Sequence, residues 1–203
     1  MFFTVWSWLV LGCYFAAAAY LGSVGTTETP PAMLQATLVL WEIAAPNALL
    51  VTFVVTFVIW PEILKKKPEA TAGLQFPVVL MQHNLNTLLV VSEIFLTRTP
   101  LLWSHAAICP LFGLVYCVFT WSIASYIAPE HGAVYLYFFF DSTQGAKFGV
   151  IAHLALLTTL VVFYGLGVGL VKALAAATTA SVPVSIQGAI LLALSLSICR
   201  FRD

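Results

Sequence analysis

Long apolar runs, separated by short polar stretches, follow one another along the whole chain. A helix needs about 20 mostly apolar residues to cross the hydrocarbon core of a bilayer, and most of these runs reach that length. The pattern therefore predicts an all-α fold, a polytopic transmembrane helical bundle of about six helices in a single domain over residues 1–203. The predicted spans are 2–22, 34–60, 76–97, 101–126, 149–170 and a shorter, weaker run at 182–199.

Composition strengthens the membrane interpretation and removes other classes. Hydrophobic residues make up 62% of the chain and charged residues only 8%, whereas soluble proteins carry about a quarter charged residues. The formal net charge is zero and the one basic block is Lys65, Lys66 and Lys67, so the chain has no electrostatic footprint for nucleic acid. We expect an integral multi-pass membrane protein whose partners include membrane lipids, and we predict no cofactor and no metal site.

The charges also predict sidedness. With the amino terminus on side A, six spans leave only Arg98 and Lys172 on the opposite side, side B. The positively charged residues then on side A are Lys65, Lys66, Lys67, Lys147, Arg200 and Arg202. The positive-inside rule makes side A cytoplasmic. Five spans would divide the positive charges evenly, so the count favours six.

The third span is unusually polar between residues 81 and 93, which read Met-Gln-His-Asn-Leu-Asn-Thr-Leu-Leu-Val-Val-Ser-Glu. Polar groups in a membrane are costly unless they face partners or a water-filled cavity, so such a cluster is by default a functional-site hypothesis. At about 100° per residue, five polar side chains fall within an arc of roughly 140°. They are Gln82, His83, Asn86, Thr87 and Glu93.

Depth along the helices divides the polar residues into two predicted groups. At about 1.5 Å per residue, His83 lies about 10 Å from the side A boundary, in the zone of Thr4 and His153. The neighbouring loop adds Asp141 and His131 to this first group. The second group, toward side B, contains Glu42, Glu93 and His105.

The two groups favour different chemistry. A hydroxyl beside a neutral imidazole is the minimal pair for nucleophilic catalysis, whereas carboxylates with a histidine suit proton transfer or structural pairing. Structural alternatives remain open for both. Threonine often bonds to its own helix backbone, His83 can be satisfied by Asn86 or Gln82, and Glu42 and Glu93 can serve as packing partners.

Several short motifs occur in an order that resembles one known family. They are Phe2-Phe3-Thr4-Val5-Trp6, Ala45-Pro46 before an apolar run, His83 ten residues ahead of Glu93, Ser104-His105 onward to Tyr116, and His131-Gly132 followed by Tyr135 to Asp141. In position and order they resemble the androgen-induced and androgen-dependent multi-pass membrane hydrolases, with the rolling stone proteins as looser relatives. The resemblance covers about residues 2–170.

This resemblance implies an intramembrane threonine hydrolase that cleaves fatty acid esters of hydroxy fatty acids, with Thr4 as nucleophile and His83 as base. Asn86, about one turn from His83 on the same face, is our predicted oxyanion donor. The family carries a transmembrane helix before its threonine and does not need the apolar run at 182–199. We expect either that the last helix replaces the missing one or that the sequence begins inside a longer chain.

Two other functions fit the same residues. The first is a noncatalytic accessory subunit of a larger membrane complex, because every loop is short and the polar faces can fix helix register. The second is a b-type haem membrane protein with His83 and His153 as axial ligands, because both lie near side A on different helices.

Overall fold

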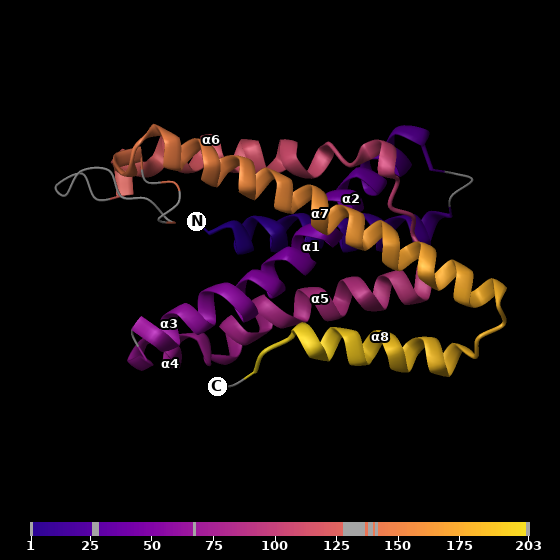
Figure 1. Ribbon diagram of the computed structural model, residues 1–203. Helices are drawn as coiled ribbons and strands as arrows, with labels where there is room; N and C mark the ends of the chain where they lie inside the picture. The colour runs from indigo at the N-terminus through magenta and orange to yellow at the C-terminus, as the bar shows by residue number, and fades with distance from the viewer. Residues whose placement is uncertain are drawn as a thin grey trace.

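The apolar runs fold as helices in the computed structural model, which confirms the all-α polytopic bundle (Figure 1). The structure describes residues 2–25, 29–66, 68–127, 137, 140 and 142–201. The long helices are α1 (Phe3–Val24), α2 (Pro31–Val54), α5 (Pro77–Thr97), α6 (Ile108–Ile127), α7 (Ala146–Thr179) and α8 (Val184–Ile198). The shorter elements are η1 (Val55–Ile59), α3 (Trp60–Lys66), η2 (Pro68–Ala70), α4 (Thr71–Leu74), η3 (Trp103–His105) and η6 (Ser142–Gln144).

Five helical segments of the described chain are long and apolar enough to cross a membrane, so the protein is a multi-pass membrane protein. α2 continues through the π-helical η1 into α3, which makes one segment of 36 residues. α8 has only 15 residues, about 22 Å of helix, and is shorter than the hydrocarbon core of about 30 Å. The sixth predicted run is thus helical but shorter than the others.

The fourth predicted span begins later than expected. Residues 101–107 contain only the short η3, and α6 starts at Ile108. The apolar residues Leu101 and Leu102 concealed this loop from a hydropathy pattern. Its backbone is nevertheless satisfied inside the protein, because Leu102 N donates to the Glu42 carboxylate and Leu102 O accepts from the Tyr164 hydroxyl.

α2 forms the centre of the bundle and packs against α1, α5, α6 and α7. Ala44, Ala45 and Ala48 are completely or almost completely buried, as is the large Trp41. Small residues let neighbouring helices approach closely in a membrane, where packing rather than water exclusion holds helices together. Pro46 leaves the carbonyl of Glu42 without its usual helical donor, and the Cys109 thiol of α6 donates to that oxygen at 3.3 Å.

α8 lies antiparallel to α5 along one side of the bundle (Figure 1). Near its start, Gln187 Oε1 accepts from Arg98, which follows α5, at 2.9 Å. Beyond its end, Arg200 is hydrogen-bonded to Asn84 in the first half of α5. The two marked chain ends therefore lie at the same end of the bundle (Figure 1), as six alternating passes require.

Candidate functional site

The side A group is built where α1, α2 and α5 pack against one another. Trp8 Nε1 donates to the carbonyl oxygen of Gln82 at 2.7 Å, which joins α1 to α5 one residue before His83. Thr4 precedes Trp8 by four residues and so lies on the same face of α1, about 6 Å closer to the start of the helix. Thr4 and His83 therefore lie on neighbouring helices near the same end of the bundle.

The hydroxyl of Thr4 has no hydrogen-bond partner among the described residues, and its side chain is half-buried. Other helical threonines use their hydroxyl on the carbonyl four residues earlier, as Thr37 does with Met33 and Thr159 with Ala155. Thr4 lies in the first turn of α1, which begins at Phe3.

The half-buried His83 lies beside an irregular part of α2. Its carbonyl oxygen accepts a hydrogen bond from the Thr52 hydroxyl. Only three residues later α2 becomes π-helical over Val55–Ile59, a deviation that is frequent at functional sites. The irregular backbone and the histidine thus meet at one level of the bundle.

Asn86, the predicted oxyanion donor, is hydrogen-bonded between α5 and α2. It is 1% exposed, and its Oδ1 accepts from Thr52 Oγ1 at 3.0 Å and from Thr87 N at 2.8 Å. Its Nδ2 donates to the Ala48 carbonyl at 3.4 Å. The amide therefore joins α5 to α2 and uses one of its two N–H donors in this contact.

Two buried polar side chains that the sequence analysis did not single out belong to α1 and α2, which pack against each other. Ser7 Oγ and both amide atoms of Asn47 are buried without a hydrogen-bond partner in the described part of the chain. The rings of Tyr14 and Trp41, 4.9 Å apart, set the register of these antiparallel helices. At about 1.5 Å per residue, Ser7 and Asn47 lie about 10 and 9 Å from that contact toward side A, hence at the same depth.

A signal for Asn47 was present in the sequence. It is an amide in the middle of an apolar span, directly after Pro46. Buried polar groups are normally paired, so an unpaired amide one helical turn from the depth of Thr4 marks this interface as a place where a polar ligand atom would be stabilised.

His153 packs among aromatic rings that lead to the start of α1, because the ring of Phe140 also contacts Tyr137, whose hydroxyl accepts from the backbone N of Phe3 at 3.3 Å. The His153 ring lies 4.9 Å from that of Trp121 in α6 and 5.2 Å from that of Phe140. Its Nδ1 is 2.6 Å from the Gly149 carbonyl oxygen. These contacts come from α6 and from residues near the start of α7, and the pairing of His83 with His153 as haem ligands stays a prediction. The predicted loop members His131 and Asp141 lie outside the described residues.

The side B group is assembled around Glu42, which is completely buried. Its carboxylate accepts from Leu102 N and the Tyr164 hydroxyl, each at 3.1 Å, and lies 2.8 Å from His105 Nδ1. The expected association of Glu42 with His105 is therefore present. Tyr164, on α7, completes the cluster and was not predicted.

Glu93 does not belong to this cluster, which corrects its predicted grouping with Glu42 and His105. Its Oε1 accepts from the Tyr14 hydroxyl at 2.6 Å. The physical reason is rotation about the helix axis, since Glu93 lies on the side of α5 that packs against α1, as Gln82 does. Similar depth alone did not bring the two carboxylates together.

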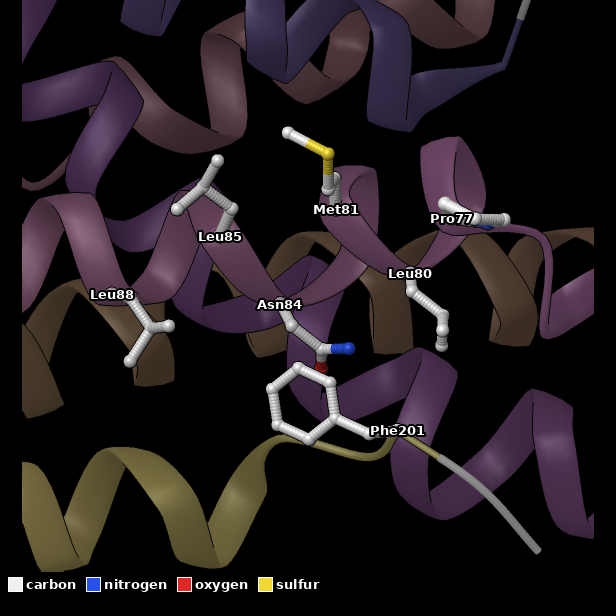
Figure 2. Close-up of a pocket in the computed structure, with 7 residues that line it drawn as sticks. All are labelled: Pro77, Leu80, Met81, Asn84, Leu85, Leu88 and Phe201. Carbon is white, nitrogen blue, oxygen red and sulfur yellow. The ribbon is translucent and has the colours of Figure 1, made fainter.

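One open apolar cavity of about 390 Å³ lies on α5, but on a different face from His83. Figure 2 shows Asn84 directed toward the ring of Phe201, with Leu80 and Leu88 to either side of it. Over the described part of the chain, no group of three or more His, Cys, Asp or Glu side chains is arranged to hold a metal ion.

No family model, curated protein or solved structure matches the chain.

Proposed function

We propose that the protein is an intramembrane threonine hydrolase that cleaves lipid esters, such as fatty acid esters of hydroxy fatty acids. The observation that carries this proposal is the unused hydroxyl of Thr4 on α1, a helix that is joined to α5 by the hydrogen bond from Trp8 to the Gln82 carbonyl, one residue before His83. The π-helical segment next to His83 and the unpaired polar groups of Ser7 and Asn47 support a site at this junction.

In the proposed reaction, Thr4 Oγ attacks the ester carbonyl carbon while a ring nitrogen of His83 removes the hydroxyl proton. The tetrahedral intermediate collapses, and the alcohol half of the ester leaves with the proton from His83. The first half-reaction leaves Thr4 acylated and His83 neutral. A water molecule, deprotonated by His83, then attacks the acyl carbonyl carbon, the bond between that carbon and Thr4 Oγ breaks, and His83 gives the proton to Thr4 Oγ. The fatty acid is released, and Thr4 and His83 are back in their starting states.

The negative oxygen of the intermediate needs a hydrogen-bond donor. We assign this part to the Asn47 amide, because the amide of Asn86 is already bound to Ala48 while that of Asn47 is buried and unpaired. One positioned donor of this kind is typically worth a factor of about a hundred or more in rate. Membrane lipids are the source of substrate, which reaches the site laterally between the helices.

The test is ester hydrolysis by purified protein in nanodiscs with Thr4→Ala, Thr4→Ser and His83→Ala. We expect Thr4→Ala and His83→Ala to reduce turnover by about a hundredfold or more, whereas Thr4→Ser keeps a hydroxyl and retains measurable activity. Thr159→Ala is the matched control, because its hydroxyl bonds only to its own helix. Full activity in folded Thr4→Ala or His83→Ala would refute the assignment.

A second candidate is a noncatalytic accessory subunit of a larger membrane complex. It is favoured by the contacts among Thr52, Asn86 and Thr87, because buried polar contacts of this kind fix the register of helices. Copurification in a fixed ratio with partner subunits, unchanged by Thr4→Ala, together with no ester turnover in any preparation, would support this function over hydrolysis. The b-type haem alternative predicts a haem absorbance band in the purified protein.

A further inference from the structure

The pair of Glu42 and His105 forms a second site at the side B end of the bundle, away from Thr4. The Glu42 carboxylate is completely buried and holds His105 by Nδ1 at 2.8 Å. Tyr164 OH and Leu102 N also donate to Glu42, so the carboxylate is fixed from three elements. A neutral imidazole that donates Nδ1–H to a carboxylate keeps one ring orientation and has a lone pair on Nε2 that can accept a hydrogen bond.

This imidazole is open on its other side. The side chain of His105 is 41% exposed, although its carboxylate partner is completely buried. It lines a cavity of about 350 Å³ together with Gln35, Leu38, Val39 and Ile108. That volume falls within the range of about 300–1,000 Å³ that small-molecule sites occupy.

The lining combines two polar groups with an apolar wall. His105 Nε2 can accept a hydrogen bond, and the exposed amide of Gln35 can both donate and accept. Leu38, Val39 and Ile108 supply the apolar wall. Gln35 is the fifth residue of α2 and lies about 6 Å from the start of the helix. The polar groups are therefore placed near the membrane boundary, where the polar ends of lipids lie.

We propose that this cavity binds a membrane lipid that carries a free hydroxyl group, such as a sterol or a diacylglycerol. The hydroxyl donates to His105 Nε2 and accepts from the Gln35 amide, while the adjoining hydrocarbon lies on Leu38, Val39 and Ile108. A phosphate or carboxylate head group is disfavoured, because none of the five lining residues is Lys or Arg and the negative Glu42 lies behind His105. This proposal does not depend on the hydrolase activity.

Photoaffinity labelling of the full chain in phosphatidylcholine nanodiscs tests the proposal. The probes are a diazirine-bearing sterol and a diazirine-bearing diacylglycerol, each compared with its O-methyl ether, and mass spectrometry locates the labelled residues. We expect saturable labelling around residues 35–39 or 105–108 by at least one free-hydroxyl probe and none by its ether. The probe that saturates identifies the lipid source.

Gln35→Leu and His105→Phe should each reduce this labelling by about fivefold, the effect of one lost hydrogen bond. Gln35→Leu leaves the contact between Glu42 and His105 intact, so a loss there cannot come from disruption of the buried carboxylate. Ser122→Ala is the control, because Ser122 is exposed and bonds only to Phe119 of its own helix. Equal labelling by a probe and its ether, unchanged labelling in both variants, or no saturable labelling by either alcohol would overturn the proposal.

Discussion

Individual polar side chains in this bundle are of two kinds. Some form hydrogen bonds between helices, and others have no hydrogen-bond partner among the described residues. The carboxylate of Glu42 has three hydrogen-bonding partners and the amide of Asn86 bonds to Ala48, Thr52 and Thr87. The hydroxyl of Thr4 and the amide of Asn47 have none among the described residues. Since an unpaired buried polar group costs free energy, the unused groups carry the functional hypothesis and the used ones stabilise the fold.

Tyr164→Phe tests the structural part of this division. The variant removes a hydroxyl that bonds to Glu42 and to the Leu102 carbonyl, at 3.1 and 2.7 Å. We expect the free energy of unfolding in mixed micelles to fall by about 1 kcal/mol. Tyr126→Phe is the matched control, because Tyr126 is 79% exposed and its loss should change stability little. Equal effects of the two substitutions would show that the Glu42 cluster does not stabilise the fold.

At the scale of the elements, α7 makes room for the loop that precedes α6. A Cβ added at Gly167 would lie 2.7 Å from Leu101 Cδ1, and one at Gly165 would lie 3.3 Å from the Trp103 ring. Leu101 therefore packs closely on Gly167 and Trp103 on Gly165, so the loop before α6 lies directly against α7. The hydropathy pattern predicted a helix from residue 101 because hydropathy reports only how apolar a segment is. It does not show that side chains of other helices form the hydrogen bonds of the backbone at Leu102.

Alanine substitutions along α7 should separate close packing from helix propensity. Gly167→Ala places a methyl group against the buried Leu101, and we expect a loss of about 1–3 kcal/mol in the free energy of unfolding. Gly169→Ala is the control, because nothing lies within 4 Å of its added Cβ, and alanine favours a helix over glycine by up to about 1 kcal/mol. The measurement is unfolding in mixed detergent micelles. A Gly167→Ala protein as stable as Gly169→Ala would contradict the proposed packing.

For the whole molecule, the direction of α8 decides the topology. Its start contacts Arg98 after α5, and the residues after its end contact Asn84 and Trp60. Arg200 is held over the ring of Trp60, the first residue of α3, at 5.0 Å, which fixes the end of α8 beside the start of α3. A short helix thus runs between the two ends of the bundle.

Cysteine labelling in sealed vesicles tests this topology. In a variant with Cys13, Cys109, Cys117 and Cys199 replaced by alanine, Ala72→Cys and Ser181→Cys should react with an impermeant maleimide from opposite sides. Both positions are exposed, one in α4 and the other before α8. If α8 crosses the membrane, a tag after the last residue should be accessible from the side of Ala72→Cys. A tag on the side of Ser181→Cys would show that α8 does not cross the membrane.

The sequence alone determined the membrane class, the all-α fold and the positions of most helices, because apolar content is a local, additive property of each run. It also indicated that residues 81–93 lie where polarity is costly, and it anticipated that Glu42 and His105 lie in one group.

Only the tertiary structure decided which polar groups meet. It paired Glu93 with Tyr14, bound Asn86 into the contact between α2 and α5, and left Asn47 unpaired. The reason is that rotation and crossing of neighbouring helices are set by side-chain packing along their whole length. Depth and helical periodicity constrain one helix at a time, so they place a residue at a level of the bundle without choosing its partner.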